Sequence, residues 1–258
     1  MNKYDIIQIA PQVTTIVDDD TSIYVVEGET AAIVIDTGYG CLNLKATLRE
    51  ITQKPLIVVC THGHIDHAFG AHYFDKAYIS IEDKHLYEEH RNLKFVLKND
   101  MMNQYNLTEK EAQSWCESTA NLEFIKPGKT FDIGGNVLEV ISLKGHTAGS
   151  IGLLDRKHRI LFSGDGVISH VWMQLEESTT LSEYLKTIKA VKSYCNDFDT
   201  IYMGHQNHET VSFIDELEVA LNDILSGSTG KPYDNIQFGG LIYKRGRCEV
   251  VYNPKRIK

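Results

Sequence analysis

The sequence predicts an α/β protein, because short β-branched segments alternate along the chain with segments whose apolar residues recur at helical spacing. No linker or low-complexity stretch divides the 258 residues, so we expect a single domain over residues 1–258. With 42% hydrophobic residues, a chain of this size buries a large core without disulfides or a structural metal. Any metal site is therefore expected to be functional.

The first part of the chain is expected to form strands. Residues 13–17, 22–27 and 31–36 are short runs rich in β-branched side chains, which suit a pleated and half-buried surface. A helix is predicted over residues 42–52, where apolar residues recur at helical spacing. The run LIVVC at 56–60 is typical of a strand that is buried on both faces.

Residues 83–118 are predicted to be a helical insertion. They lack β character and are rich in Glu, Lys, Leu and Met, which favours two or three helices. Thr108 and Glu111 have the spacing of a capping box and mark the start of one helix. We interpret the insertion as a candidate lid over the site or, alternatively, as a solvated helical face with an ordinary apolar stripe.

The second half is expected to alternate strands with helices in the same way. The predicted strands are 137–143, 150–155, 159–164 and 200–204, and the predicted helices are about 181–195 and about 210–225. A C-terminal hairpin over 241–253 turns at Arg245-Gly246.

Charge and composition exclude several classes of function. The net charge is −9 and the basic residues are scattered, whereas nucleic-acid binding needs a clustered positive surface. We find neither an export signal nor an apolar run of about 18 residues that could span a membrane. The five cysteines are odd in number and widely spaced, as is typical of reduced thiols. We therefore expect a cytoplasmic protein that acts on a small-molecule substrate, with no nucleic-acid or membrane partner and with its oligomeric state open.

The sharpest chemical feature is the segment THGHIDH, which follows the buried run LIVVC directly. It places four possible ligands, His62, His64, Asp66 and His67, within six residues. Imidazole and carboxylate groups are the usual ligands of zinc and other first-row metals. Gly63 lets the backbone turn sharply, so that neighbouring side chains can converge. The spacing predicts a metal site. The alternative is that the segment is a solvated polar loop without a function.

Three further polar residues, His146, Asp165 and His205, follow predicted strands and lie next to glycines. The carboxyl ends of strands in α/β sheets are where ligands and catalytic groups gather. Taken alone, each of these residues is about as often a structural or surface residue as a functional one. Because several strand ends agree, we predict that all three belong to the same metal site.

These residues resemble the motif set of the metallo-β-lactamase superfamily. The matching residues are His62, His64, Asp66, His67, His146, Asp165 and His205, in the order of the family, together with an early Asp36-Thr37-Gly38 turn. The resemblance covers about residues 12–253. It implies a four-layer αββα sandwich with a dinuclear site in a groove at one edge.

The resemblance also implies a role for each residue. One metal ion would be held by His62, His64 and His146, a second by Asp66, His67 and His205, and Asp165 would bridge them. Asp36 would be the carboxylate that orients a ligating imidazole. The expected cofactors are two divalent metal ions, zinc in the first place, with iron or manganese as alternatives because N and O ligands accept all three.

A hydrolase is the leading functional prediction. Two such ions lower the pKa of a shared water, so that hydroxide can attack the carbonyl carbon of an ester, thioester, lactone or amide. Asp66 is the expected catalytic residue, because it could orient the nucleophile or move its proton. We expect cleavage of an ester, thioester or lactone of a small molecule by an enzyme similar to glyoxalase II, thioesterases and lactonases.

The residues around the motif narrow the substrate. Asp165 stands where some lactam-cleaving members have a cysteine ligand, which disfavours that activity. Lactonases of quorum signals have a tyrosine shortly after the bridging aspartate, where this chain has residues 166–169 (GVIS). His170, Trp172 and Met173 are expected in a loop at the rim of the site and are candidates to shape the substrate pocket. The alternative for Trp172 and Met173 is packing under the following helix.

Two other hypotheses remain at this point. The first is an iron oxygenase resembling the persulfide dioxygenases of the same superfamily, which use one iron at the positions of His62, His146 and Asp165. The second is a metal-binding fold without enzymatic activity, which is expected where ligands have been lost, and none has been lost here. The number and identity of the bound metal ions distinguish the hydrolase from the oxygenase.

Overall fold

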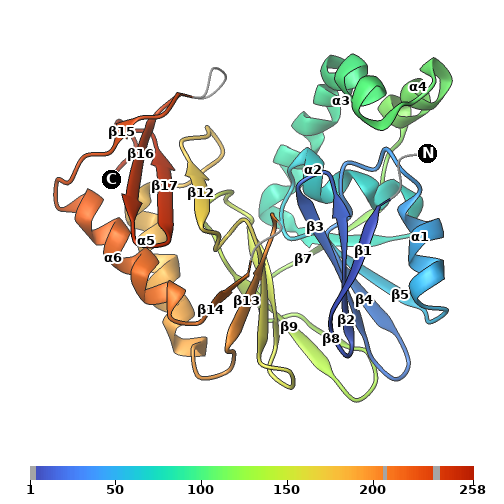
Figure 1. Ribbon diagram of the computed structural model, residues 1–258, viewed down its shortest axis with the longest axis horizontal. Helices are drawn as coiled ribbons and strands as arrows, with labels where there is room; N and C mark the ends of the chain where they lie inside the picture. The colour runs from blue at the N-terminus through green and yellow to red at the C-terminus, as the bar shows by residue number, and fades with distance from the viewer. Residues whose placement is uncertain (1–3, 206–207, 235–238) are drawn as a thin grey trace. The chain divides into compact units, whose positions relative to one another are not determined.

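The computed structural model describes residues 4–205, 208–234 and 239–258 (Figure 1). Its contacts divide the chain into two units. The first comprises residues 1–126 and 131–137, and the second comprises residues 127–130 and 138–258. None of the helices among the described residues is long and apolar enough to cross a membrane.

The first unit is built on a seven-stranded sheet with the order β1-β2-β3-β4-β5-β6-β7. The strands are β1 (Asp5–Ala10), β2 (Val13–Asp18), β3 (Thr21–Glu27), β4 (Ala32–Ile35), β5 (Leu56–Val59), β6 (Ala77–Ser80) and β7 (Leu122–Ile125). β1 to β4 are antiparallel, whereas β4 to β7 run parallel. Ile35 pairs with Val59, so β4 and β5 end side by side, and the residues that follow them emerge together at one edge of the sheet.

The helices of the first unit are α1 (Leu44–Ile51), α2 (Ile65–Ala68), α3 (Lys84–Tyr105) and α4 (Glu109–Glu117), with short 3-10 turns η1 (Phe69–Tyr73) and η2 (Ile81–Asp83). α3 and α4 form the predicted helical insertion and are drawn in green in Figure 1. The predicted capping box is confirmed. Thr108 Oγ1 accepts a hydrogen bond from Glu111 N at 3.3 Å, and the Glu111 carboxylate accepts one from Thr108 N at 2.7 Å.

A buried lysine ties α3 to the end of α4. Lys94 is 1% exposed, and its ammonium group donates to the carbonyls of Trp115 and Ser118, both at 2.9 Å, and to Ser118 Oγ at 2.8 Å. The same group lies over the rings of Phe69 and Trp115. A cation at the C-terminal end of a helix satisfies its last carbonyls and opposes its dipole. Burial lowers the pKa of Lys94 to about 8.

The second unit contains a smaller sheet and all of a larger one except residues 131–137 at its edge, which are grouped by their contacts with the first unit. The larger has the order β14-β13-β11-β10-β9-β8 and the smaller has the order β12-β17-β16-β15. The strands are β8 (Thr130–Asp132), β9 (Val137–Ser142), β10 (Ile151–Asp155), β11 (Ile160–Gly164), β12 (His170–Met173), β13 (Thr200–Met203), β14 (His208–Thr210), β15 (Lys231–Pro232), β16 (Leu241–Arg245) and β17 (Cys248–Tyr252). β10 is antiparallel to both β9 and β11, and β13 is parallel to β11. β9, β11 and β13 therefore end at the same edge of the sheet.

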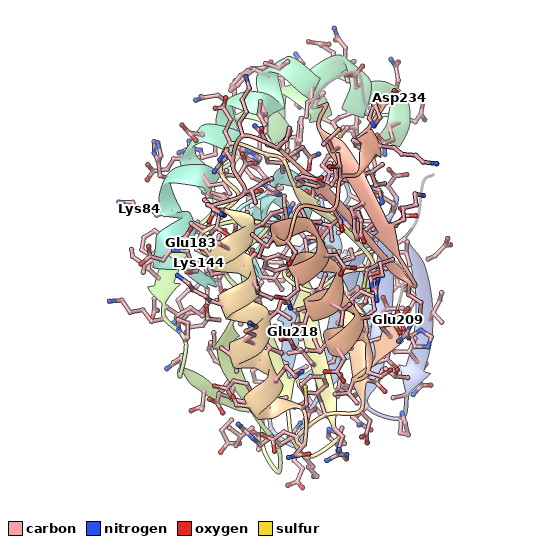
Figure 2. All side chains as sticks on the ribbon, turned by 90° about the vertical axis from the view of Figure 1, so that its left-hand side faces the viewer. Lys84, Lys144, Glu183, Glu209, Glu218 and Asp234 are labelled. Carbon is pink, nitrogen blue, oxygen red and sulfur yellow. The ribbon has the colours of Figure 1, made fainter. Side chains whose placement is uncertain are left out.

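Two helices cover the core of the second unit. α5 (Leu181–Val191) and α6 (Phe213–Leu225) lie side by side, with Glu183 on α5 and Glu218 on α6 labelled in Figure 2. The apolar faces of both helices are buried with those of β9–β13 and of the smaller sheet. On the outside, Lys192 Nζ joins the end of α5 to Glu218 at 2.7 Å.

The segment after Asp165 corrects one expectation. His170, Trp172 and Met173 were expected in a loop, but they belong to β12, which pairs in parallel with β17. The strand alternates, because Val171 and Met173 are buried while His170 and Trp172 are half-buried. Its pairing partner lies about 80 residues further along the chain, so local sequence patterns do not reveal it.

The role of Lys94 can be tested by Lys94→Met. The variant keeps the apolar stem but removes the charged donor to the carbonyls of Trp115 and Ser118, of which the Trp115 carbonyl retains hydrogen bonds from Ser118. We expect the free energy of unfolding to fall by about 1–3 kcal/mol, measured by urea denaturation. Lys84→Met, on the exposed start of the same helix, is the control and should cost under about 1 kcal/mol. Equal stabilities of the two variants would contradict the capping role.

Candidate metal centre

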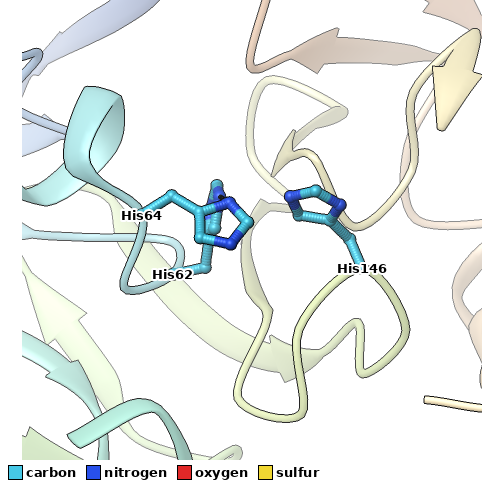
Figure 3. Close-up of side chains that lie close together, drawn as sticks. All are labelled: His62, His64 and His146. Atoms are coloured by element: carbon cyan, nitrogen blue, oxygen red, sulfur yellow. Dashed lines mark hydrogen bonds between the residues drawn. The ribbon is translucent and has the colours of Figure 1, made fainter. Parts of the chain in front are cut away.

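The first unit contributes a buried cluster of ligands from the loop between β5 and α2. His62, His64 and His67 are all buried, and Asp66 is partly exposed. The imidazoles of His62 and His64 lie against each other (Figure 3), with 3.1 Å between His62 Nε2 and His64 Nδ1. Asp66 Oδ2 lies 3.3 Å from His67 Nε2. Two ligand atoms on one tetrahedral ion, each about 2.0–2.1 Å from it, are separated by about 3.3 Å. Both pairs therefore have the spacing of neighbouring ligands.

Asp36 accepts hydrogen bonds from His67 of this cluster and from the neighbouring Thr61, and orients them. It follows β4 directly, is 2% exposed and has a positive φ of 63°, which L residues rarely adopt. Its Oδ2 accepts a hydrogen bond from His67 Nδ1 at 2.8 Å, and its two oxygens accept from Thr61 N at 2.6 Å and Thr61 Oγ1 at 2.9 Å. A carboxylate only accepts hydrogen bonds, so the proton of His67 is on Nδ1 and the lone pair is on Nε2.

Thr61 fixes the tautomer of His62 in a similar way. Because its hydroxyl donates to Asp36, the hydroxyl oxygen accepts from His62 Nδ1, at 3.1 Å. His62 therefore also presents the lone pair of Nε2. A single buried carboxylate fixes the tautomers of two imidazoles, one directly and one through a threonine.

Two further acidic residues position the ligand loop, and sequence patterns did not identify either. Asp83, at the end of η2, accepts a hydrogen bond from Gly63 N at 2.9 Å. Asp18, at the end of β2, is 1% exposed and accepts from Tyr39 N at 2.8 Å and from Tyr105 Oη at 2.9 Å. A Cβ on Gly38 would lie 2.1 Å from Asp18 Oδ2, so only glycine fits that turn. Burial raises the pKa of Asp18 to about 6.

Two other side chains approach this cluster, one from β3 and one from the helical insertion, the candidate lid. Thr21, at the start of β3, donates through Oγ1 to Asp66 Oδ2 at 3.4 Å. His90, on α3, stacks on the ring of His64 with 4.9 Å between the ring centroids and an angle of 7°. The helical insertion therefore reaches the ligand cluster of its own unit.

The second unit contributes His146, Asp165 and His205 from the carboxyl ends of β9, β11 and β13. His146 stands on the loop between β9 and β10 (Figure 3) and donates from Nδ1 to the carbonyl of Trp172 at 2.8 Å, so its lone pair is on Nε2. Asp165 Oδ2 lies 3.6 Å from His146 Nε2 and 3.2 Å from His205 Nε2. One carboxylate oxygen thus lies near two imidazoles, as a bridging ligand would.

Close packing fixes the loop that carries His146. A Cβ on Gly145 would lie 2.1 Å from the ring of Tyr184, so the loop can approach α5 only with glycine there. Tyr184 also donates from its hydroxyl to the carbonyl of Gly166 at 2.9 Å, which places the loop after Asp165 against the same ring.

The three residues that we expected to shape a substrate pocket have different surroundings. Met173 is 2% exposed and lies in the core of the second unit, so it packs there and does not line a rim. His170 and Trp172 are half-buried on the opposite face of β12. Trp172 contacts a candidate ligand through its backbone, because its carbonyl accepts a hydrogen bond from His146.

The positioning role of Asp36 can be tested by Asp36→Asn. An amide no longer enforces the Nδ1 proton of His67, so we expect metal affinity to fall by about 10–100-fold, measured by competition with a chelator. Asp155→Asn is the matched control, because Asp155 is equally buried and contacts His158 Nδ1 at 2.7 Å in the other unit. A similar loss of affinity in both variants would sink the proposed role.

The buried carboxyl of Asp18 predicts a dependence of stability on pH. Its pKa in the folded protein, about 6, exceeds its usual value of 3.8, so the folded state binds the proton more tightly. The resulting stabilisation is present at acidic pH and is lost as the pH rises through about 6. From about pH 4.5 to about pH 7.5, the native protein should lose about 2 kcal/mol of unfolding free energy relative to Asp18→Asn.

Urea denaturation of both proteins at the two pH values measures this difference. Asp75→Asn, at a fully exposed carboxyl, is the control and should differ from the native protein by under about 0.5 kcal/mol at both pH values. A pH-independent difference between the native protein and Asp18→Asn would disprove the assignment.

Comparison with known proteins identifies relatives in sequence and in fold. Residues 16–215 match the family model described as Metallo-beta-lactamase superfamily. Acyl-coenzyme A thioesterase MBLAC2 from Homo sapiens is 26% identical over 184 residues, which are 64% of this chain and 65% of that protein. Hydroxyacylglutathione hydrolase GloC from Haemophilus influenzae is 26% identical over 196 residues, which are 72% of this chain and 84% of that protein. The match therefore spans less than two thirds of the human relative.

Solved structures show the same fold. A metallo-beta-lactamase from Pontibacter korlensis matches with a TM-score of 0.63 and 18% identity over 86% of this chain and 100% of the other. The DIM-1 metallo-beta-lactamase matches with a TM-score of 0.63 and 15% identity over 86% of this chain and 99% of the other. At these identities the likeness concerns the fold alone, and the predicted fold class is confirmed. By the family model and by this fold, the chain belongs to the metallo-β-lactamase superfamily.

Proposed function

We propose that this protein is a metal-dependent hydrolase that cleaves thioesters of small molecules. In this proposal the two ligand sets act as one dinuclear site, with His62, His64 and His146 around one ion, Asp66, His67 and His205 around the other, and Asp165 between them. The observation that carries the proposal is the complete set of nitrogen and oxygen ligands, fixed within each unit by neighbouring groups.

The donor set fits divalent metal ions. It consists of imidazoles and carboxylates, which bind zinc, iron and manganese. In His62, His67 and His146 the nitrogen opposite the ligating one is hydrogen-bonded to a hydroxyl, a carboxylate or a carbonyl, as is usual for metal-binding histidines. When bound, such ions supply a water activated near neutral pH and polarise the carbonyl oxygen of the substrate.

The side chains of the protein then move the proton. Asp66 is held by Thr21 and lies beside His67, and we assign it the proton released from the attacking water. The new C–O bond forms as the C–S bond breaks, and the proton passes to the departing thiolate. Water and a thioester thus give a carboxylic acid and a thiol, with no serine or cysteine nucleophile.

Two relatives favour a thioester over other acyl substrates. One is named for hydrolysis of acyl-coenzyme A and the other for hydrolysis of hydroxyacylglutathione. In both kinds of molecule the acyl group is bonded to the sulfur of a thiol. A thiolate is also a good leaving group at neutral pH, so one activated water and one carboxylate suffice for the reaction.

The proposal predicts metal-dependent release of thiol from acyl thioesters. His64→Ala removes a ligand, so we expect kcat/KM to fall by at least about 100-fold. His85→Ala is the control, because His85 is exposed on α3 with 83% of its side chain accessible. Thiol release can be followed with a chromogenic disulfide. Equal activity of the two variants would disprove the mechanism.

Metal analysis provides an independent measurement. Protein purified without added metal or chelator should contain about two divalent ions per chain, and removing them should abolish activity that added zinc restores. About one iron per chain, with oxygen consumption in the presence of persulfides, would instead identify the oxygenase described above.

A further inference from the structure

A buried carboxamide follows β12 in the second unit. Gln174 is 7% exposed, and neither its Nε2 nor its Oε1 has a hydrogen-bond partner among the residues that the structure describes. An amide buried without partners costs free energy, and most buried polar groups in folded proteins are paired. A carboxamide whose donors and acceptor are all unsatisfied among the described residues is suited to a ligand.

Gln174 lies in the segment that holds His146. Two residues before it, the carbonyl of Trp172 accepts from His146 Nδ1 at 2.8 Å. Four residues after it, Ser178 Oγ donates to the carbonyl of His146 at 2.8 Å. The segment thus contacts a candidate metal ligand on both sides of Gln174, and a group bound by Gln174 is kept near that ligand.

Two aromatic rings stand beside this segment in fixed orientations. Trp172 and Tyr233 meet edge to face, with 6.4 Å between ring centroids and an angle of 71°. His170 Nδ1 donates to the Glu249 carboxylate at 2.6 Å, so its Nε2 accepts from the hydroxyl of Tyr233, at 3.2 Å. The rings of Trp172 and Tyr233 are therefore oriented before any ligand binds, which lowers the entropy cost of binding.

Gly240 connects the rings to the carboxamide. Its carbonyl accepts from Tyr233 N at 3.0 Å, and a Cβ on it would lie 3.3 Å from the Cβ of Gln174. Tyr233 and Gln174 thus both approach Gly240, in the chain that leads into β16.

We infer that Gln174, Trp172 and Tyr233 form the subsite for the thiol portion of the substrate, and that this portion carries a secondary amide. The inference rests on the thioesterase function proposed above. A primary carboxamide offers two N–H donors and one carbonyl acceptor, so it can donate to the carbonyl of a secondary amide or accept from its N–H. The aromatic rings supply apolar contact for the methylene groups beside the amide.

The charges nearby do not favour an anionic recognition group. Two cations near this segment are already engaged: Lys244 lies 2.5 Å from Glu249, which His170 also contacts, and Arg256 donates to the carbonyls of Leu175 and Ser178. The pantetheine arm of an acyl-coenzyme A and the peptide of glutathione both provide secondary amides. The shared chemistry is an amide-bearing thiol, and the experiment distinguishes the two sources.

The test compares thioesters of one acyl group with three thiols: N-acetylcysteamine, which reproduces the end of the pantetheine arm, glutathione, and ethanethiol, which has no amide. We expect the native protein to prefer one of the first two over ethanethiol by at least about tenfold in kcat/KM. In Gln174→Met, which has similar volume but no hydrogen bonds, this ratio should approach one through a higher KM. Gln113→Met is the control, because Gln113 pairs with Glu117 on the surface of α4.

Thermal unfolding gives a readout that does not depend on turnover. Gln174→Met removes a buried unpaired amide, so it should melt about 2–4 °C above the native protein. S-methylglutathione or S-methyl-N-acetylcysteamine, which lack a thiolate that could bind metal, should raise the Tm of the native protein and not that of Gln174→Met.

The outcomes separate the two proposals. If the native protein cleaves all three thioesters equally well, or if Gln174→Met keeps both the preference and the thermal shift, the subsite is wrong while the thioesterase function stands. If the native protein cleaves none of them, the thioesterase function is wrong. A Tm of the native protein that is raised by an S-methyl compound would still support the subsite in that case.

Discussion

The buried carboxylate of Asp36 is the contact on which the ligand cluster of the first unit depends. It takes hydrogen bonds from His67 and from both the backbone and side chain of Thr61, while its backbone adopts a left-handed conformation that costs energy. That conformation is maintained because Asp36 N donates to Val59 O and the end of β4 lies beside the end of β5. Sheet pairing therefore compensates the strain. Because the backbone of Asp36 is fixed by the sheet, its carboxylate has a fixed position and orients the imidazoles. The edge of the sheet determines where the candidate ligands lie, but without the carboxylate it would not determine which nitrogen of each imidazole carries the proton.

The second unit reaches a similar result by different contacts. His146 is oriented by a backbone carbonyl, that of Trp172, and its loop is held by the ring of Tyr184. A carbonyl carries no charge, so it fixes the ring without the strong polarisation that a carboxylate gives. The two units thus hold imidazoles with unequal electrostatic support. In the second unit the carboxylate of Asp165 lies beside two imidazoles, those of His146 and His205.

The fold class was predictable from the sequence, and candidate ligands could be named from it, because both depend on local patterns. β-branched runs, helical spacing and glycines beside polar residues are all visible within a few residues of each other. Contacts between distant segments were not visible. β12 is a strand only because β17 pairs with it, and Met173 is a core residue because that pairing turns it away from His170 and Trp172. Asp18 escaped notice for the same reason, since its partner Tyr105 lies 87 residues away.

The same distinction explains why the motif specifies a reaction more closely than a substrate. Ligands follow strand ends, where sheet geometry fixes them, and their chemistry is set by donor type. Groups suited to recognition lie on an edge strand and its loop, where a buried amide such as Gln174 can remain unpaired among the described residues at a cost in stability. This loss of stability is tolerated where hydrogen bonds to a bound ligand compensate it. With the proposed subsite, sequence changes along β12 would alter the thiol that is recognised, while the imidazoles held by Asp36 and by the Trp172 carbonyl keep their orientation.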